Sequence, residues 1–94
     1  MTTKKRERLD VIKDIIQTIK DNRQIKPTRL LYASNLSPQM FKEYITELIE
    51  KKFIKLEMEG KEGKEKKFFS LTKKGQDFLT EYKVITNFIE NFGL

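Results

Sequence analysis

Two short helices separated by a polar turn are predicted within residues 27–54, and this pattern constrains the fold of the chain more than any other feature. Pro27 suits the first position of a helix, because the N–H that it lacks would be unpaired there. Asn35 lies in the polar break that follows, where such side chains compete for backbone hydrogen bonds and favour turns. Ser37 and Pro38 then begin a second helix as N-cap and first residue. The pattern predicts a helix-turn-helix with helices over 27–34 and 37–52.

The second helix of this pair is amphipathic. Phe41, Tyr44, Ile45 and Leu48 recur at helical spacing and mark its buried face. If its outer side enters the major groove of DNA, the exposed side chains of its first turns face base edges, where Gln, Lys and Glu have matching partners. The residues expected there are Pro38, Gln39, Met40, Lys42, Glu43 and Thr46.

Residues 54–71 read as two strands around a charged, glycine-bearing loop, which predicts a β-hairpin. Such a hairpin after a helix-turn-helix is a wing, and Ile25 is expected to add a short third strand at the sheet edge. The spelling G-x-x-G at 60–63 also occurs in the RNA-binding loop of KH domains, but that loop joins two helices. Phosphate contacts are expected from Thr28, Arg29 and Ser37 in the helix-turn-helix, and from Lys61, Lys64 and Lys66 in the hairpin.

A further helix is predicted before this unit, over 6–21, after a basic arm at 1–5. Its buried stripe is marked by apolar residues at helical spacing, namely Leu9, Ile12, Ile15, Ile16 and Ile19.

The last helix, over 72–92, is capped by Thr72 and carries an apolar seam of about two heptads. Part of the seam covers the first helix, and the remainder exceeds the apolar surface that a monomer normally exposes. A homodimer through this helix is therefore expected, and the alternative is a helix folded entirely onto its own domain. The expected interface residues are Leu79, Tyr82, Ile85, Phe88, Ile89 and Phe92.

The net charge of +6 suits a polyanionic partner, and its distribution is uneven. Residues 1–36 have a net charge of +5 and residues 59–75 a net charge of +3, whereas 37–58 are neutral and 76–94 have −2. Attraction to DNA is therefore expected to come mostly from the arm and the hairpin, with modest base specificity.

Several other classes are not expected. The chain has no Cys and no His, so a metal site would need carboxylates alone, and no catalytic constellation is recognisable. We expect neither an enzyme nor a cofactor nor a small-molecule ligand. The start MTTKKRER has no apolar signal region and no run reaches membrane-spanning length, which favours a cytoplasmic, nucleoid-associated protein without membrane partners.

A set of ordered motifs resembles the small archaeal winged-helix regulator family, which includes chromatin-associated members that dimerise through a C-terminal helix. The matching segments are Thr28-Arg29-Leu30-Leu31-Tyr32, Asn35-Leu36-Ser37, Tyr44 with Leu48, and Leu71-Thr72-Lys73-Lys74-Gly75. The chain departs from the family pattern at Lys52, where the family usually has a helix-ending glycine.

The expected fold class is therefore α+β, mainly α: one winged helix-turn-helix domain over 1–94, with a three-helix core, a hairpin wing and a C-terminal dimerisation helix. The expected function is double-stranded DNA binding by a homodimeric transcriptional regulator. Two alternatives remain open: a low-specificity, chromatin-like DNA-binding protein, and a winged helix that contacts other proteins.

Overall fold

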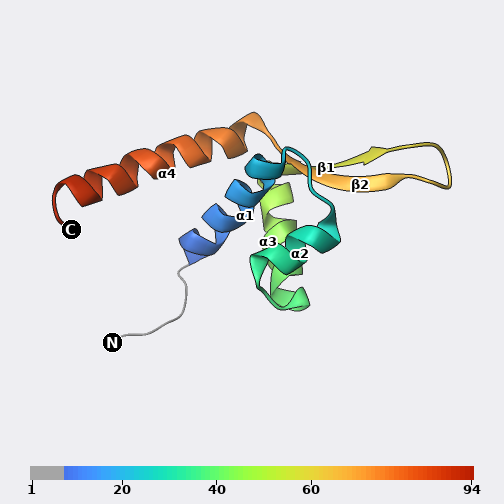
Figure 1. Cartoon of the computed structure of the whole chain (residues 1–94), viewed down its shortest axis with the longest axis horizontal. Helices are drawn as coiled ribbons and strands as arrows, with labels where there is room; N and C mark the ends of the chain where they lie inside the picture. Colours follow the sequence, from blue (N-terminus) through green and yellow to red (C-terminus); the bar gives the residue numbers. More distant parts are fainter. Residues whose placement is uncertain (1–7) are drawn as a thin grey trace.

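The computed structural model describes residues 8–94, so the expected basic arm lies outside the described residues. Helices and a hairpin follow one another in the order shown in Figure 1. They are α1 (Arg8–Asn22), α2 (Pro27–Ser34), α3 (Pro38–Glu50), β1 (Ile54–Glu59), β2 (Lys66–Leu71) and α4 (Lys73–Asn91).

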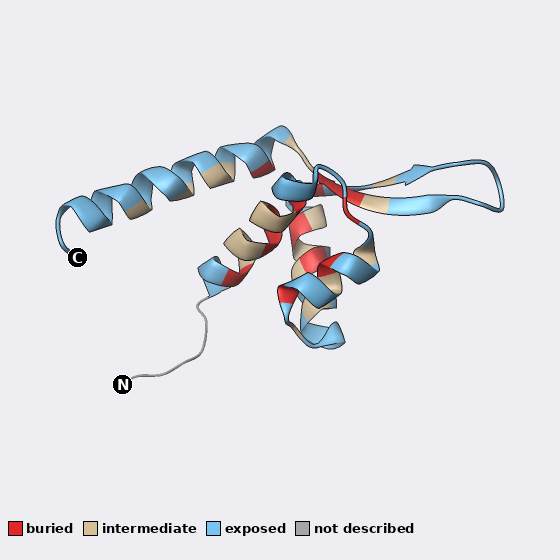
Figure 2. Ribbon diagram, in the orientation of Figure 1, coloured by how far each residue is buried: buried red, intermediate tan, exposed pale blue. Residues whose placement is uncertain are grey.

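The core lies where α1, α2, α3 and the base of the hairpin meet (Figure 2). Ile15, Ile16 and Ile19 of α1 are buried there, together with Leu30 of α2. The expectation that Leu9 is buried is wrong, because it lies in the exposed first turn of α1 and its exposed fraction is 52%. The further buried residues of the core are Val11, Ile25, Ile45, Leu48, Ile54 and Phe69.

The turn between α2 and α3 is built as its residue types require. Asn35 ends α2 in the left-handed region, at φ 59°, which asparagine tolerates better than most residues. Leu36 packs against the core. The Ser37 hydroxyl accepts a hydrogen bond from the backbone N–H of Met40, at 3.2 Å, and Pro38 is the first helical residue. The predicted N-cap of the second helix is confirmed.

The end of α3 is closed by two backbone hydrogen bonds. The N–H of Phe53 donates to the carbonyl of Leu48 at 2.9 Å, and the N–H of Lys52 donates to Ile49 at 3.0 Å. This is the Schellman pattern, which places one residue in the left-handed region. Lys52 occupies that position, at φ 68°. The lysine therefore ends the helix with the backbone conformation usually given to glycine.

The two strands form an antiparallel hairpin in which Leu56 is opposite Phe69 and Glu59 is opposite Lys66. Ile25 bridges Phe69 through two backbone hydrogen bonds, of 3.1 and 2.8 Å. The expected third strand is therefore reduced to a single bridge.

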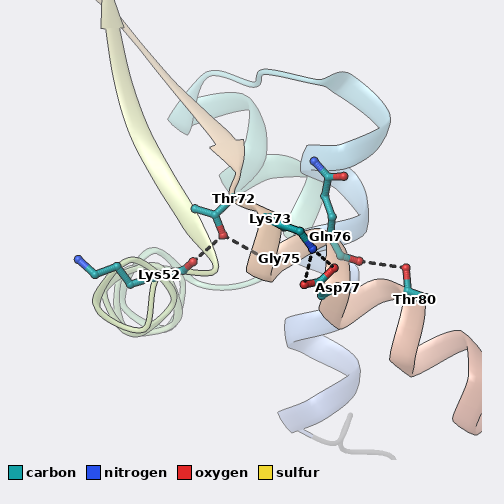
Figure 3. A network of polar contacts seen from close by, with 7 residues as sticks. All are labelled: Lys52, Thr72, Lys73, Gly75, Gln76, Asp77 and Thr80. Carbon is teal, nitrogen blue, oxygen red and sulfur yellow. Dashed lines mark hydrogen bonds and ion pairs between the residues drawn. The ribbon is translucent and has the colours of Figure 1, made fainter.

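The start of α4 is fixed to the end of α3 (Figure 3). The Thr72 hydroxyl donates to the carbonyl oxygen of Lys52 at 2.5 Å and accepts from the N–H of Gly75 at 3.1 Å. Gly75 is buried so close to the backbone that a Cβ there would collide with the carbonyl oxygen of Phe53. From this anchor α4 extends away from the body, in the direction opposite to the hairpin (Figure 1). The architecture is the predicted α+β winged helix-turn-helix, mostly helical.

Candidate nucleic-acid interface

The outer side of α3 is open to solvent. A shallow hollow on this side of the helix, which we call the α3 face, is lined by Gln39, Lys42, Glu43, Thr46, Glu47 and Glu50. All the residues expected to contact bases are exposed, including Met40, whose exposed fraction is 46%. The buried side of α3, with Ile45 and Leu48, faces the core. The helix can therefore present its polar side to a ligand without any change in its packing.

The hydrogen-bonding groups on the α3 face are varied. Gln39 carries both a donor and an acceptor, Lys42 carries donors, and Glu43 carries acceptors. Base edges in the major groove present both kinds of group, so such a face can read sequence. Its charge is unfavourable for DNA, since one lysine stands against three glutamates.

Arg8 changes this balance, and sequence reasoning missed it. Its guanidinium forms an ion pair with the Glu47 carboxylate and lies 5.6 Å from the centre of the Tyr44 ring. Lys51 donates to the same carboxylate at 2.9 Å. Hydrogen bonds from Arg8 and from Lys51 lower the pKa of Glu47 to about 2. The carboxylate is thus held charged and paired with two cations.

The residues expected to contact phosphates from the helix-turn-helix are also exposed. Thr28 and Arg29 lie in the first turn of α2, and Ser37 lies just before α3. The Ser37 oxygen already accepts the capping hydrogen bond from Met40. Its hydroxyl proton still allows it to donate to a phosphate oxygen.

The tip of the hairpin is shaped by glycines and carries exposed lysines. Gly60 and Gly63 have φ values of 113° and 85°, which other residues rarely adopt. Lys61, Lys64 and Lys66 are all exposed around this turn. Two apolar side chains of the same hairpin, Leu56 and Met58, are also exposed, by 43% and 62%. Alternating apolar and polar residues over 54–58 are typical of a half-buried strand, but the hairpin extends away from the helical core (Figure 2).

The residues expected at a dimer interface divide into two groups. Leu79 and Tyr82 are half-buried, and the Tyr82 hydroxyl donates to Asp10 of α1 at 2.8 Å. This hydrogen bond raises the pKa of Tyr82. Beyond them the seam is uncovered in the described chain. Its exposed members are Ile85, Phe88, Ile89 and Phe92, joined by Val84.

The described residues contain no group of three or more His, Cys, Asp or Glu side chains that could bind a metal ion. Within the same part of the chain, no helix combines the length and the apolar character needed to cross a membrane.

Solved structures with this architecture cover most of the chain. Sso10a-2, a DNA-binding protein from Sulfolobus solfataricus, matches with a TM-score of 0.71 over 93% of this chain and 85% of its own, at 18% identity. A MarR family transcriptional regulator from Silicibacter pomeroyi DSS matches with a TM-score of 0.68 over 82% and 50%, at 13% identity. A PadR family transcription regulator from Clostridium difficile R20291 matches with 0.62 over 86% and 96%, at 20% identity. At these identities the likeness establishes the fold alone.

Two proteins of Methanocaldococcus jannaschii are similar in sequence. The uncharacterized protein MJ0287 is 42% identical over 72 residues, which make up 77% of this chain and 65% of that protein. The uncharacterized protein MJ0290 is 29% identical over 85 residues, which make up 90% of this chain and 36% of that protein. The chain thus spans less than two thirds of the length of either relative.

A model of the winged helix-turn-helix family matches residues 5–90, which include the helix-turn-helix, the whole hairpin and all of α4 but its last residue. Because this match and the archaeal relatives agree with the architecture, the chain belongs to the winged helix-turn-helix family, in an archaeal type.

Proposed function

We propose that the protein binds double-stranded DNA as a homodimeric transcriptional regulator. In this proposal the α3 face lies in the major groove, and the lysines of the hairpin contact phosphates of the DNA backbone. The proposal is carried by the exposure of the polar α3 face in a helix-turn-helix whose apolar side, with Ile45 and Leu48, is buried. The hairpin that follows this helix carries exposed lysines. Helix-turn-helix proteins place the second helix of the motif in the major groove.

Dimerisation is part of the same proposal. The seam of α4 leaves Ile85 and Phe88 each 57% exposed and Phe92 66% exposed. The centroids of the Phe88 and Phe92 rings lie 4.7 Å apart, so the two rings form one apolar surface on the outer part of the helix. A second copy of α4 would cover this surface, and a dimer would offer DNA two α3 faces, as helix-turn-helix dimers do.

Specificity is proposed to be modest. The α3 face alone is acidic, so most attraction must come from residues around it, and phosphate contacts carry no sequence information. This balance favours a modest preference among DNA sequences, and a chromatin-like protein that occupies DNA broadly is the alternative.

Fluorescence anisotropy with a DNA duplex, over a salt series, tests the proposal. If each protomer neutralises ~3 to 5 phosphates, the slope of log affinity against log salt is roughly −5 to −9 for the dimer. The double variant Lys64→Ala/Lys66→Ala is expected to lower the affinity for all duplexes alike. The double variant Gln39→Ala/Lys42→Ala is expected to reduce the preference for particular base sequences.

Two outcomes revise or reject the proposal. A preference of less than about tenfold for a selected operator over random duplex favours the broad, chromatin-like role. A salt-independent interaction, or none, rejects DNA binding and leaves the winged helix as a protein-contacting module.

A further inference from the structure

We propose that Arg8 is a DNA-contacting residue, a phosphate ligand that α1 supplies to the edge of the α3 face, and that Glu47 positions it. This inference rests on the proposed DNA-binding function and adds a contact that neither the helix-turn-helix motif nor the wing provides. The juxtaposition is specific: Arg8 begins α1, yet its guanidinium is paired with a residue of α3 that is 39 positions away.

Two contacts fix the place of the guanidinium. The Glu47 carboxylate accepts a hydrogen bond from it, and the Tyr44 ring lies 5.6 Å away. Glu47 is itself paired with Lys51, the C-cap residue that directly follows α3. An arginine held in this way loses little conformational freedom when it binds a further anion.

The Arg8 side chain remains available to a ligand, because 56% of its surface is exposed. A guanidinium carries five N–H donors in a planar fork, a geometry that suits phosphate oxygens. Its partner Glu47 lines the α3 face together with Gln39 and Lys42. If α3 lies in the major groove, Arg8 is therefore at the edge of the surface that the neighbouring phosphate groups would face.

The net charge around the α3 face also supports a role for Arg8 in DNA binding. The lining residues of the face comprise one lysine and three glutamates, a net charge of −2. When Arg8 and Lys51 are added, three cations stand against three carboxylates, and the net charge becomes zero. Without these two residues the face would repel the DNA backbone that it is proposed to approach.

The test must separate a phosphate contact from simple neutralisation of Glu47. The double variant Arg8→Gln/Glu47→Gln keeps the net charge of the wild-type protein, so it is compared with wild type by duplex anisotropy over a salt series. Removal of a phosphate contact is expected to reduce the steepness of the salt slope by about 1 for each protomer, and the affinity by about 3- to 10-fold for each contact that is lost, near 0.1 M salt. Wild-type affinity and slope in the double variant would overturn the inference.

Two further variants serve as controls. Arg8→Gln and Arg23→Gln each remove one positive charge, the first at the start of α1 and the second directly after its end. Arg8→Gln is expected to make the salt slope shallower and Arg23→Gln to keep the wild-type slope. An equal loss in both variants would show a general charge effect and overturn the inference. Arg8→Lys retains the charge and is expected to preserve the slope, and a slope as shallow as that of Arg8→Gln contradicts the contact. If wild type binds no duplex, the proposed function itself fails; if wild type binds and the double variant matches it, this inference alone fails.

Discussion

Lys52 ends α3 with a backbone conformation, φ 68°, that strains any residue with a Cβ. Two Schellman hydrogen bonds hold it there, and Phe53, the next residue, packs against the core. The conformation is thus imposed by the surrounding structure, at the point where the helix-turn-helix passes into the hairpin. The same residue also supplies the carbonyl oxygen that accepts from Thr72.

Lys52→Gly is expected to stabilise the protein by about 0.5–1 kcal/mol, because relief of the left-handed strain exceeds the added freedom of the unfolded chain. Thermal unfolding followed by circular dichroism should show a rise of about 2–6 °C in Tm. Lys52→Ala, which removes the same side chain but keeps the Cβ, is the matched control and should show no such rise. Equal stabilisation by both variants would mean that the lysine side chain, not the backbone, is unfavourable here.

Glu47 makes a contribution to stability that depends on pH. Hydrogen bonds from Arg8 and Lys51 lower its pKa to about 2 in the folded protein, from 4.5 without partners. A lowered pKa stabilises the fold above the unfolded-state value, and this stabilisation is lost as the pH falls from about 4.5 towards 2. Urea unfolding across this range should therefore show a weaker acid dependence for Glu47→Gln than for wild type.

Glu62→Gln is the control for this pH dependence, since it removes one carboxylate from the exposed hairpin loop. It should retain the wild-type acid dependence. Parallel curves for wild type and Glu47→Gln would contradict the ion-paired arrangement around Glu47.

At the scale of elements, the joint between α4 and the rest of the domain depends on close backbone approach. Gly75 is buried in the first turn of α4, against the carbonyl oxygen of Phe53. Gly75→Ala is expected to destabilise the protein by about 1–3 kcal/mol, because backbone atoms would have to move to admit the methyl group. Helix propensity alone predicts the opposite sign, a stabilisation of up to about 1 kcal/mol.

Chemical denaturation of Gly75→Ala decides between these two signs. Gln76→Ala, at the exposed neighbouring position, is the control and should change stability by less than about 0.5 kcal/mol. A more stable Gly75→Ala protein would mean that α4 is not packed against this backbone.

The elements differ in how far the sequence specifies them. Ser37 and Thr72 were predictable as N-caps, because capping uses residues a few positions apart, and the structure confirms both. Contacts between distant residues, such as Arg8 with Glu47, carry no periodic signal and could not be predicted. Leu9 was wrongly expected in the core for a related reason. Helical spacing identifies the apolar face of a helix, but it does not show at which residue the neighbouring elements stop burying that face.

At the scale of the whole molecule, the proposed homodimer follows from where α4 lies. The described chain extends 54 × 28 × 21 Å, with the hairpin and α4 on opposite sides of the helical body (Figure 1). The spacing of apolar residues in α4 predicted one seam, and the structure divides it between α1 and solvent. The part that faces solvent is where a second copy is proposed to pack.

Phe88→Glu is expected to convert the proposed dimer into a monomer, because a carboxylate would have to be buried in an apolar interface. Sedimentation at micromolar concentration should show the mass of one chain for this variant and of two for wild type. Asn87→Glu introduces the same charge at a neighbouring exposed position of α4 and should remain dimeric. A monomeric wild-type protein would refute the dimer.

The surface of the protein that a DNA duplex contacts can be measured directly from backbone amide chemical shifts in a ¹⁵N-labelled sample. Addition of a duplex should shift amides over residues 37–47 and 60–67, which cover most of α3, the loop of the hairpin and the start of β2, and leave α4 unchanged. Shifts that map mainly to α4, or no shifts at all, would contradict the claim that the outer side of α3 and the hairpin form the DNA-binding surface.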